Sequence, residues 1–291
     1  MNDASGVGRI VLHLLAGLMS LMGLGDSAQD HDPVPPGTPV RIMPLGDSIT
    51  DGLNVPGGYR IELWRRLRLE GREIDFVGSR SNGPAGLGDH DHEGHPGWTI
   101  DDVRGHVIHW LRSSDPRIVL LHIGTNDLPR DPAGAPARLS RLIDRITGTA
   151  PRAHLYVSTL VPSKRVGQEV RWYNRELSRI VLAAAAGNAR IHLVHMHGAL
   201  STDDLLDSTH PTRTGYARMA AVWDDALRSF WKTPVTGRGA DGPVQGPDRA
   251  RSPAGDPTAP VPGGSGRILE AAISPVTESA AAGQKRPSRR A

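Results

Sequence analysis

The chain has 291 residues, of which 22% are charged and 38% are hydrophobic, a composition typical of globular proteins with one sizeable core. It contains no Cys, which excludes disulfides, thiolate nucleophiles and Cys-bound metals. The formal net charge of +3 lies wholly after Lys232, where eight Lys and Arg stand against five Asp and Glu. The rest of the chain is therefore neutral, and we expect no nucleic-acid partner.

The N-terminus carries an apolar stretch over residues 10–24, preceded by Arg9 and too short for a confident membrane span. This pattern predicts a signal peptide over residues 1–28 and hence a secreted protein. Asp3 in the leading segment and His13 inside the apolar stretch are unusual for a signal, so an uncleaved anchor or a wrongly assigned start remain alternatives. A Pro-rich linker is expected at residues 29–39.

Strand-like and helix-like segments alternate over residues 40–232. Strands are expected at residues 40–45, 74–77, 118–123, 155–158 and 191–195, and the near-continuous apolar run at 118–123 is typical of a parallel strand covered on both faces. Helices are expected at residues 59–70, 99–111, 139–146, 170–186 and 212–230. This order predicts a single α/β domain of three layers, with a parallel sheet of about five strands flanked by helices.

Some of these helices carry more detailed signals. Thr99 and Asp102 are spaced as an approximate capping box, and the apolar face that follows is Val103, Val107, Trp110 and Leu111. In the helix at 59–70, the apolar side chains at helical spacing are Ile61, Trp64 and Leu67. We expect Trp64, together with Met43 of the first strand, to lie in the core.

The C-terminal segment, residues 233–291, is rich in Pro, Gly, Ala and Arg without apolar periodicity, which predicts a disordered basic tail. It is expected to be a solvated extension without a role of its own. The alternative is a basic tether to an acidic polymer or surface.

Polar residues follow three of the expected strands, at the sheet edge where open α/β proteins bind their ligands. The stretches are "GDSIT" at 46–50, "GTND" at 124–127 and "DSTHP" at 207–211. Each alone is compatible with a turn. Together Ser48, His210, Asp207 and Asn126 supply a nucleophile, a base, a group to orient the base and an amide donor, the parts needed for acyl transfer.

These blocks, with "GHPGWT" at 94–99, resemble those of the SGNH hydrolases, also called GDSL esterases. The resemblance covers residues 41–230 and implies their flavodoxin-like fold. It implies Ser48 as nucleophile, His210 as base and Asp207 as the residue that holds the imidazole. It further implies an oxyanion hole made of the backbone N–H groups of Ser48 and Gly97 and the side-chain amide of Asn126.

Within the family, the stretch "HDHEGHPGWTIDD" resembles carbohydrate esterases that remove acetyl groups from xylan. We therefore expect a serine esterase acting on short acyl esters, foremost O-acetyl groups of a polysaccharide, through an acyl-enzyme intermediate. It needs no cofactor, and we expect a monomer without an obligate protein partner. Alternatives are a lipase, lysophospholipase or small-metabolite deacylase, and an inactive carbohydrate-binding module.

A polar stretch before Gly97 has a competing interpretation. Its members are Asp89, His90, Asp91, His92, Glu93 and His95. They could hold a metal. We favour a metal-free loop that forms the wall of the crevice and sets specificity, because the expected mechanism needs no metal.

The remaining polar and aromatic candidates are assigned to structure rather than chemistry. We expect Trp98 to pack at the start of its helix, with stacking on a sugar ring as the alternative. Asp47 and Asp127 are expected to fix loop geometry through backbone hydrogen bonds. Hydrogen-bonded structural roles are expected for the four histidines His122, His192, His195 and His197.

Overall fold

A seven-stranded sheet organises residues 37–232, the part of the chain that the computed structural model describes. The strands are β1 (Val40–Gly46), β2 (Ile74–Phe76), β3 (Arg80–Ser81), β4 (Asp91–Gly94), β5 (Ile118–His122), β6 (His154–Ser158) and β7 (Ile191–Val194). Their order is β3-β4-β1-β5-β6-β7, and β2 also pairs with β1. Every pair is parallel except β3 with β4.

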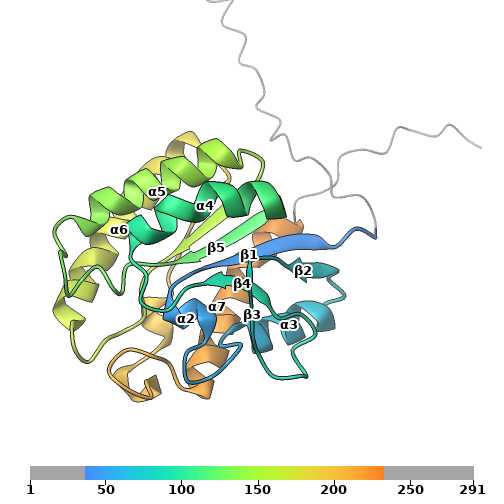
Figure 1. The fold of residues 1–291 in the computed structure, drawn as a ribbon, viewed down its shortest axis with the longest axis horizontal. Helices are drawn as coiled ribbons and strands as arrows, with labels where there is room; N and C mark the ends of the chain where they lie inside the picture. Colours follow the sequence, from blue (N-terminus) through green and yellow to red (C-terminus); the bar gives the residue numbers. More distant parts are fainter. Residues whose placement is uncertain (1–36, 233–291) are drawn as a thin grey trace, which may run out of the picture. The chain divides into compact units, whose positions relative to one another are not determined.

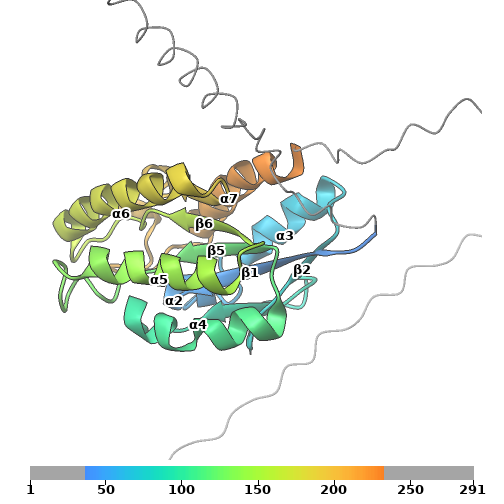
Figure 2. The same cartoon turned by 90° about the horizontal axis from the view of Figure 1, so that it is seen from above.

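Helices cover both faces of the sheet (Figure 1). They are α2 (Ser48–Asp51), α3 (Arg60–Leu69), α4 (Ile100–Ser114), α5 (Ala135–Thr149), α6 (Gly167–Gly187) and α7 (Arg213–Lys232), with short 3-10 turns at His197–Ala199 and Thr202–Asp204. Helices α4, α5 and α6 pack on one face, where Figure 2 shows them over the strands, and α3 and α7 pack on the other. The predicted three-layer α/β domain is confirmed.

Side-chain alternation along the strands divides the core into two clusters. Met43 and Leu45 of β1 join the cluster under α4, α5 and α6, whereas Val40 and Ile42 join the cluster under α3 and α7. Every residue of β5 is buried, which explains why its sequence is an almost continuous apolar run. The capping box of α4 is present as predicted, with Thr99 and Asp102 bonded reciprocally.

The sheet is larger than the predicted five strands. Strands β3 and β4 are additional, and β4 occupies a segment expected to be a loop. It is short and polar, with an intrinsic composition unlike that of a strand. Pairing with the end of β1, Leu45 opposite Glu93 and Gly46 opposite Gly94, gives it a strand conformation that only the tertiary fold supplies.

Several element boundaries also differ. Helix α5 begins at Ala135 rather than at residue 139, because a first turn containing Pro136 precedes its apolar face. Strand β7 ends at Val194, which leaves His195 outside it. In α3, Leu63 is buried, whereas Trp64 is only partly buried against the core and is not a full core residue as predicted.

The predicted signal peptide (1–28), most of the linker (29–36) and the predicted tail (233–291) lie outside the described residues. Within residues 37–232, no helix combines the length and apolar character needed to cross a membrane.

Candidate active site

Ser48 lies where β1 ends and the one-turn helix α2 begins. Asp47 caps this helix by accepting a hydrogen bond from the backbone N–H of Ile49 at 2.9 Å, and only 6% of Ser48 is exposed. Gly46 is required at the approach to the turn, since a Cβ there would collide with the His122 carbonyl of the neighbouring strand. The backbone before Ser48 therefore packs directly against the end of β5.

His210 and Asp207 reach Ser48 from the segment between β7 and α7. The Nε2 atom of His210 lies 2.8 Å from Ser48 Oγ, and its Nδ1 atom lies 2.8 Å from Asp207 Oδ2. The tautomer with its ring proton on Nδ1 satisfies both contacts. Its Nδ1–H donates a hydrogen bond to Asp207, and its Nε2 accepts a hydrogen bond from the Ser48 hydroxyl. The structure thus brings the three side chains into one hydrogen-bonded chain.

The 207–210 turn is held by the Asp207 carboxylate and by one backbone hydrogen bond. Asp207 Oδ1 accepts the N–H groups of Thr209 and His210 at 2.7 and 2.8 Å, and the N–H of Leu206 bonds to the His210 carbonyl at 2.8 Å. One carboxylate therefore orients both the imidazole and the loop that carries it. Asp and His three residues apart suit this function because a single turn brings them together.

The electrostatics keep Asp207 ionised. Partial burial alone would raise its pKa, but hydrogen bonds from the His210 backbone N–H, the His210 ring and the Thr209 N–H outweigh burial and lower the pKa to about 2. Asp207 is therefore negatively charged at neutral pH and can stabilise an imidazolium at His210.

Gly97 lies in the turn between β4 and α4, with a left-handed φ of 82°. This turn is joined to both neighbouring segments: the His95 N–H donates to the Gly46 carbonyl at 3.0 Å, and Asn126 Nδ2 donates to the Trp98 carbonyl at 2.9 Å. The turn with Gly97 is therefore tied on one side to the strand that precedes Ser48 and on the other to Asn126. The backbone N–H of Gly97 makes no hydrogen bond within residues 37–232.

A buried Glu–His pair behind this turn is a feature that sequence reasoning missed. Glu93 is fully buried and accepts hydrogen bonds from the backbone and hydroxyl of Ser79 and from His95 Nε2, the last at 2.7 Å. The His95 ring stacks on both Trp98 and Trp110, with ring centroids 4.2 and 4.7 Å away, and these two indoles also contact each other, with ring centroids 5.8 Å apart. The predicted packing role of Trp98 is confirmed. The Glu93–His95 pair thus supports the turn that contains Gly97 from its buried side.

Two more polar residues of this stretch, Asp89 and His92, are also used in structural bonds. Asp89 accepts the backbone N–H groups of Phe76 and Asp91, and His92 Nδ1 accepts the N–H of Gly94. No group of three or more metal-ligating side chains occurs among residues 37–232. A sequence gives no sign that distinguishes such buried acceptors from metal ligands, because both need the same residue types.

Asp127 has the loop-fixing role expected of it. Its carboxylate accepts the N–H of Ile100 at 3.0 Å, which joins the Asn126 loop to the start of α4. Arg138 Nε donates to the same carboxylate at 2.8 Å and supplies the opposite charge that the buried side chain needs.

The expectation for the four structural histidines holds for only two of them. His192 pairs with His154 at 3.0 Å, and His197 Nδ1 bonds to the Leu160 carbonyl at 2.9 Å. His195 is exposed. For His122 the expectation is wrong: it is fully buried, and within the described residues neither ring nitrogen has a partner. Burial lowers its pKa to about 4, so the ring is neutral at pH 7.

Comparisons with a family model and with known proteins both identify this chain as similar to esterases and acylhydrolases. A model of the GDSL-like lipase/acylhydrolase family matches residues 45–218. A multidomain esterase of Ruminococcus flavefaciens is 28% identical over 237 residues, which are 71% of this chain but only 30% of the relative. The platelet-activating factor acetylhydrolase IB subunit alpha1 of Homo sapiens is 26% identical over 183 residues, or 60% of this chain and 70% of the relative.

Among solved structures, a family 3 carbohydrate esterase of Clostridium thermocellum matches with a TM-score of 0.63 and 34% sequence identity. The match covers 66% of this chain and 97% of that structure. Nearly the whole of that structure therefore corresponds to about two thirds of this chain.

Proposed function

The chain belongs to the GDSL-like lipase/acylhydrolase family, and from this premise we propose that it is a serine esterase for short-chain, foremost acetyl, esters. The observation that carries the proposal is the chain of contacts from Ser48 Oγ through the His210 ring to Asp207, with both distances at 2.8 Å. Nucleophile, base and orienting carboxylate stand at the spacing that acyl transfer needs.

The reaction follows from these positions. As Ser48 Oγ attacks the ester carbonyl, its proton passes to His210 Nε2, and the carbonyl oxygen becomes an oxyanion. Collapse of this intermediate breaks the bond to the alcohol, which takes the proton from His210 and leaves an acyl group on Ser48. Water, deprotonated by the same imidazole, then attacks the acyl group. The bond from the acyl carbon to Ser48 Oγ breaks, His210 returns the proton to Oγ, and the acid is released.

Three donors serve the oxyanion in this proposal: the backbone N–H groups of Ser48 and Gly97 and the Asn126 amide. Asn126 Nδ2 has two hydrogens, of which Trp98 takes one, so the other is left for the substrate. Loss of one such donor typically costs on the order of 10²- to 10³-fold in rate. All three donors are neutral, so they stabilise the oxyanion without altering the charge on His210.

For the natural substrate we propose O-acetyl groups of a polysaccharide such as xylan. The support is the likeness to a family 3 carbohydrate esterase and to a multidomain esterase. A lipid or small-molecule ester is the alternative, supported by the likeness to a platelet-activating factor acetylhydrolase subunit. An inactive binding module is disfavoured by the intact contacts of Ser48, His210 and Asp207.

We further propose that the protein is exported and acts as a monomer. The support for export is the signal-like sequence at residues 10–24. Cell fractionation followed by N-terminal sequencing tests export, and light scattering tests the monomer. Retention of an intact N-terminus in the membrane fraction would favour the anchor alternative.

The deciding experiment measures hydrolysis of nitrophenyl acetate, a long-chain nitrophenyl ester and acetylated xylan. We expect acetyl esters to be preferred, and Ser48→Ala to lower kcat by on the order of 10⁴-fold or more. Ser113→Ala, a hydroxyl deletion near the end of α4, is the matched control and should leave kcat unchanged. A trapped acyl group should map by mass spectrometry to the peptide with Ser48.

The outcomes separate the alternatives. Turnover that survives Ser48→Ala would contradict the serine mechanism. A preference for the long-chain ester would favour the lipase reading. Rapid hydrolysis of nitrophenyl acetate without release of acetate from xylan would keep the esterase and reject the polymer as substrate.

A further inference from the structure

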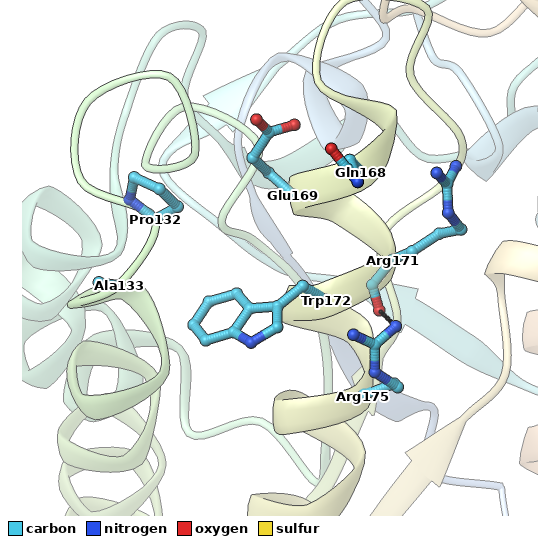
Figure 3. Close-up of a pocket in the computed structure, with 7 residues that line it drawn as sticks. All are labelled: Pro132, Ala133, Gln168, Glu169, Arg171, Trp172 and Arg175. Atoms are coloured by element: carbon cyan, nitrogen blue, oxygen red, sulfur yellow. Dashed lines mark hydrogen bonds between the residues drawn. The ribbon is translucent and has the colours of Figure 1, made fainter.

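A cavity of about 580 Å³ lies between the loop before α5 and the first turns of α6 (Figure 3). The loop contributes Pro132 and Ala133. Helix α6 contributes Gln168, Glu169, Arg171, Trp172 and Arg175. Figure 3 shows the indole of Trp172 extending from α6 toward Pro132 and Ala133. None of the residues assigned to ester hydrolysis lines this cavity.

The cavity nevertheless lies at the same edge of the sheet as Ser48. In a parallel sheet with helical crossovers, the helices run opposite to the strands, so the N-termini of α5 and α6 lie beside the carboxyl ends of β5 and β6. Pro132 is six residues after Asn126, a span of at most about 20 Å when fully extended. Hydrogen bonds from Arg130 and Asp131 back to the Asp127 carbonyl form a turn that shortens this span.

The lining combines an aromatic surface with unneutralised positive charge. Trp172 is partly buried against the core, so its ring is held in place. Arg171 and Arg175 are exposed, one helical turn apart, and neither has a carboxylate within ion-pair distance in the described part of the chain. Arg179, the next arginine on the helix, differs because it pairs with Glu176.

These features suit a sugar that carries a carboxylate. The flat ring of Trp172 offers a stacking surface for the apolar face of a pyranose. The guanidinium groups of Arg171 and Arg175 form strong, directional bonds with carboxylates. Gln168 and Glu169 offer partners for sugar hydroxyls, and Figure 3 places Glu169 at the end of the cavity away from Arg175, so it does not oppose a carboxylate bound there.

We propose that this cavity is a subsite for a uronic acid residue of the acetylated polysaccharide, bound a few sugar units away from the ester at Ser48. The inference rests on the proposed function, since it assigns the polymer of that function a second point of contact. The triad acts on the acetyl group, and the cavity selects chains with acidic substituents and holds them along the sheet edge.

Binding is tested first, without turnover, in the Ser48→Ala protein. Affinity electrophoresis is run in gels containing glucuronoxylan, and in gels containing the same polymer after its carboxyl groups have been reduced. We expect Arg171→Gln/Arg175→Gln to weaken binding to the acidic polymer about tenfold, equivalent to about 1.4 kcal/mol, and to have no effect with the reduced polymer. Arg179→Gln, on the same helix, is the matched control and should bind normally.

The second test measures the kinetics of the same variants with Ser48 in place. The double arginine variant and Trp172→Ala should lower kcat/KM on acetylated glucuronoxylan while keeping the wild-type kcat on nitrophenyl acetate, which does not reach the cavity. Added salt should weaken the acidic polymer's advantage in the wild-type enzyme and not in the arginine variant. Because the arginines are exposed, their variant keeps the test valid if Trp172→Ala does not fold.

The results separate this inference from the proposed function. Equal binding of both polymers by the wild-type protein, or unchanged binding by the arginine variant, would overturn the subsite. Loss of binding in that variant, together with no acetate release from any polymer, would support the subsite and reject the polymer as substrate. Absence of hydrolysis dependent on Ser48 would reject the proposed function alone.

Discussion

Two carboxyl groups near His210 are shifted in opposite directions. Asp207, partly exposed and bonded to several N–H groups, has a pKa of about 2. Asp47 is fully buried, and burial raises its pKa to about 6 despite the hydrogen bond from Ile49 and the lowering effect of His210. Asp207 is thus charged at both acidic and neutral pH, whereas Asp47 becomes charged only near pH 6.

The shift at Asp47 predicts a pH dependence of stability. The unfolded chain loses this proton near pH 3.8 and the folded protein only near pH 6, so the folded state binds more protons between these values. Its contribution to the free energy of unfolding is therefore present at low pH and lost as pH rises from 4 to 6, by up to about 3 kcal/mol. Asp47→Asn keeps the cap oxygen but cannot ionise, and should remove this decline.

Urea unfolding at several pH values between 4 and 8 measures the effect. Asp144→Asn, which alters an exposed carboxyl on α5, is the control and should keep the wild-type slope. An Asp47→Asn protein with an unchanged dependence between pH 4 and 6 would show that the buried carboxyl is not the titrating group.

At the scale of elements, the short strand β4 links the nucleophile turn to the Gly97 turn. It pairs with the end of β1, and Gly94 passes so close to the backbone of Thr50 and Asp51 in α2 that a Cβ would collide with it. A polar, four-residue strand contributes little stability by itself. Its position depends on this close packing and on the burial of Glu93.

We therefore expect Gly94→Ala to lower the free energy of unfolding by about 1–3 kcal/mol, because the added methyl group must separate β4 from α2. It should also lower kcat on nitrophenyl acetate, since Ser48 and Gly97 lie on the two sides of that contact. Gly105→Ala is the matched control: it lies inside α4 with open space around it and should stabilise by about 0.5–1 kcal/mol. Thermal unfolding compares the two variants. If Gly94→Ala were as stable as Gly105→Ala, the close packing of β4 against α2 would be contradicted.

At the scale of the whole molecule, the family match, the sheet and all the proposed site residues lie between residues 37 and 232. No residue after Lys232 is matched by the family model or proposed for the site. Its role as a solvated extension or as a tether stays a prediction.

Deletion of residues 233–291 should leave the unfolding temperature and the hydrolysis of nitrophenyl acetate at wild-type values, because no proposed site residue is removed. Calorimetry and steady-state kinetics measure both. Unchanged catalysis with weaker retention on an acidic polymer would favour the tether, whereas loss of folding would show that the domain needs the segment.

The fold could be predicted well from sequence where apolar patterning is strong. Strand β5 was recognisable as a continuous apolar run, because it is buried on both faces. Helix α4 was recognisable by apolar residues at helical spacing, because it is buried on one face. Strand β4 was not, because its polar residues form a strand only through pairing with β1. The residues of the candidate site could be predicted from motifs that follow strand ends. The Glu93–His95 pair could not be predicted, because the sequence does not distinguish a buried Glu from an exposed one.

By itself the sequence determined the order of five of the strands and of the five long helices, the family, and which side chains could serve as nucleophile, base and amide donor, because local pattern and residue type are enough for each. Only the tertiary structure decided which polar groups are buried, paired or left without partners. Examples are the stacked His95, the His122 ring without a partner in residues 37–232, the elevated pKa of Asp47 and the cavity beside Trp172. These depend on neighbours distant in the chain. Burial and charge are properties of the assembled surroundings rather than of any one residue.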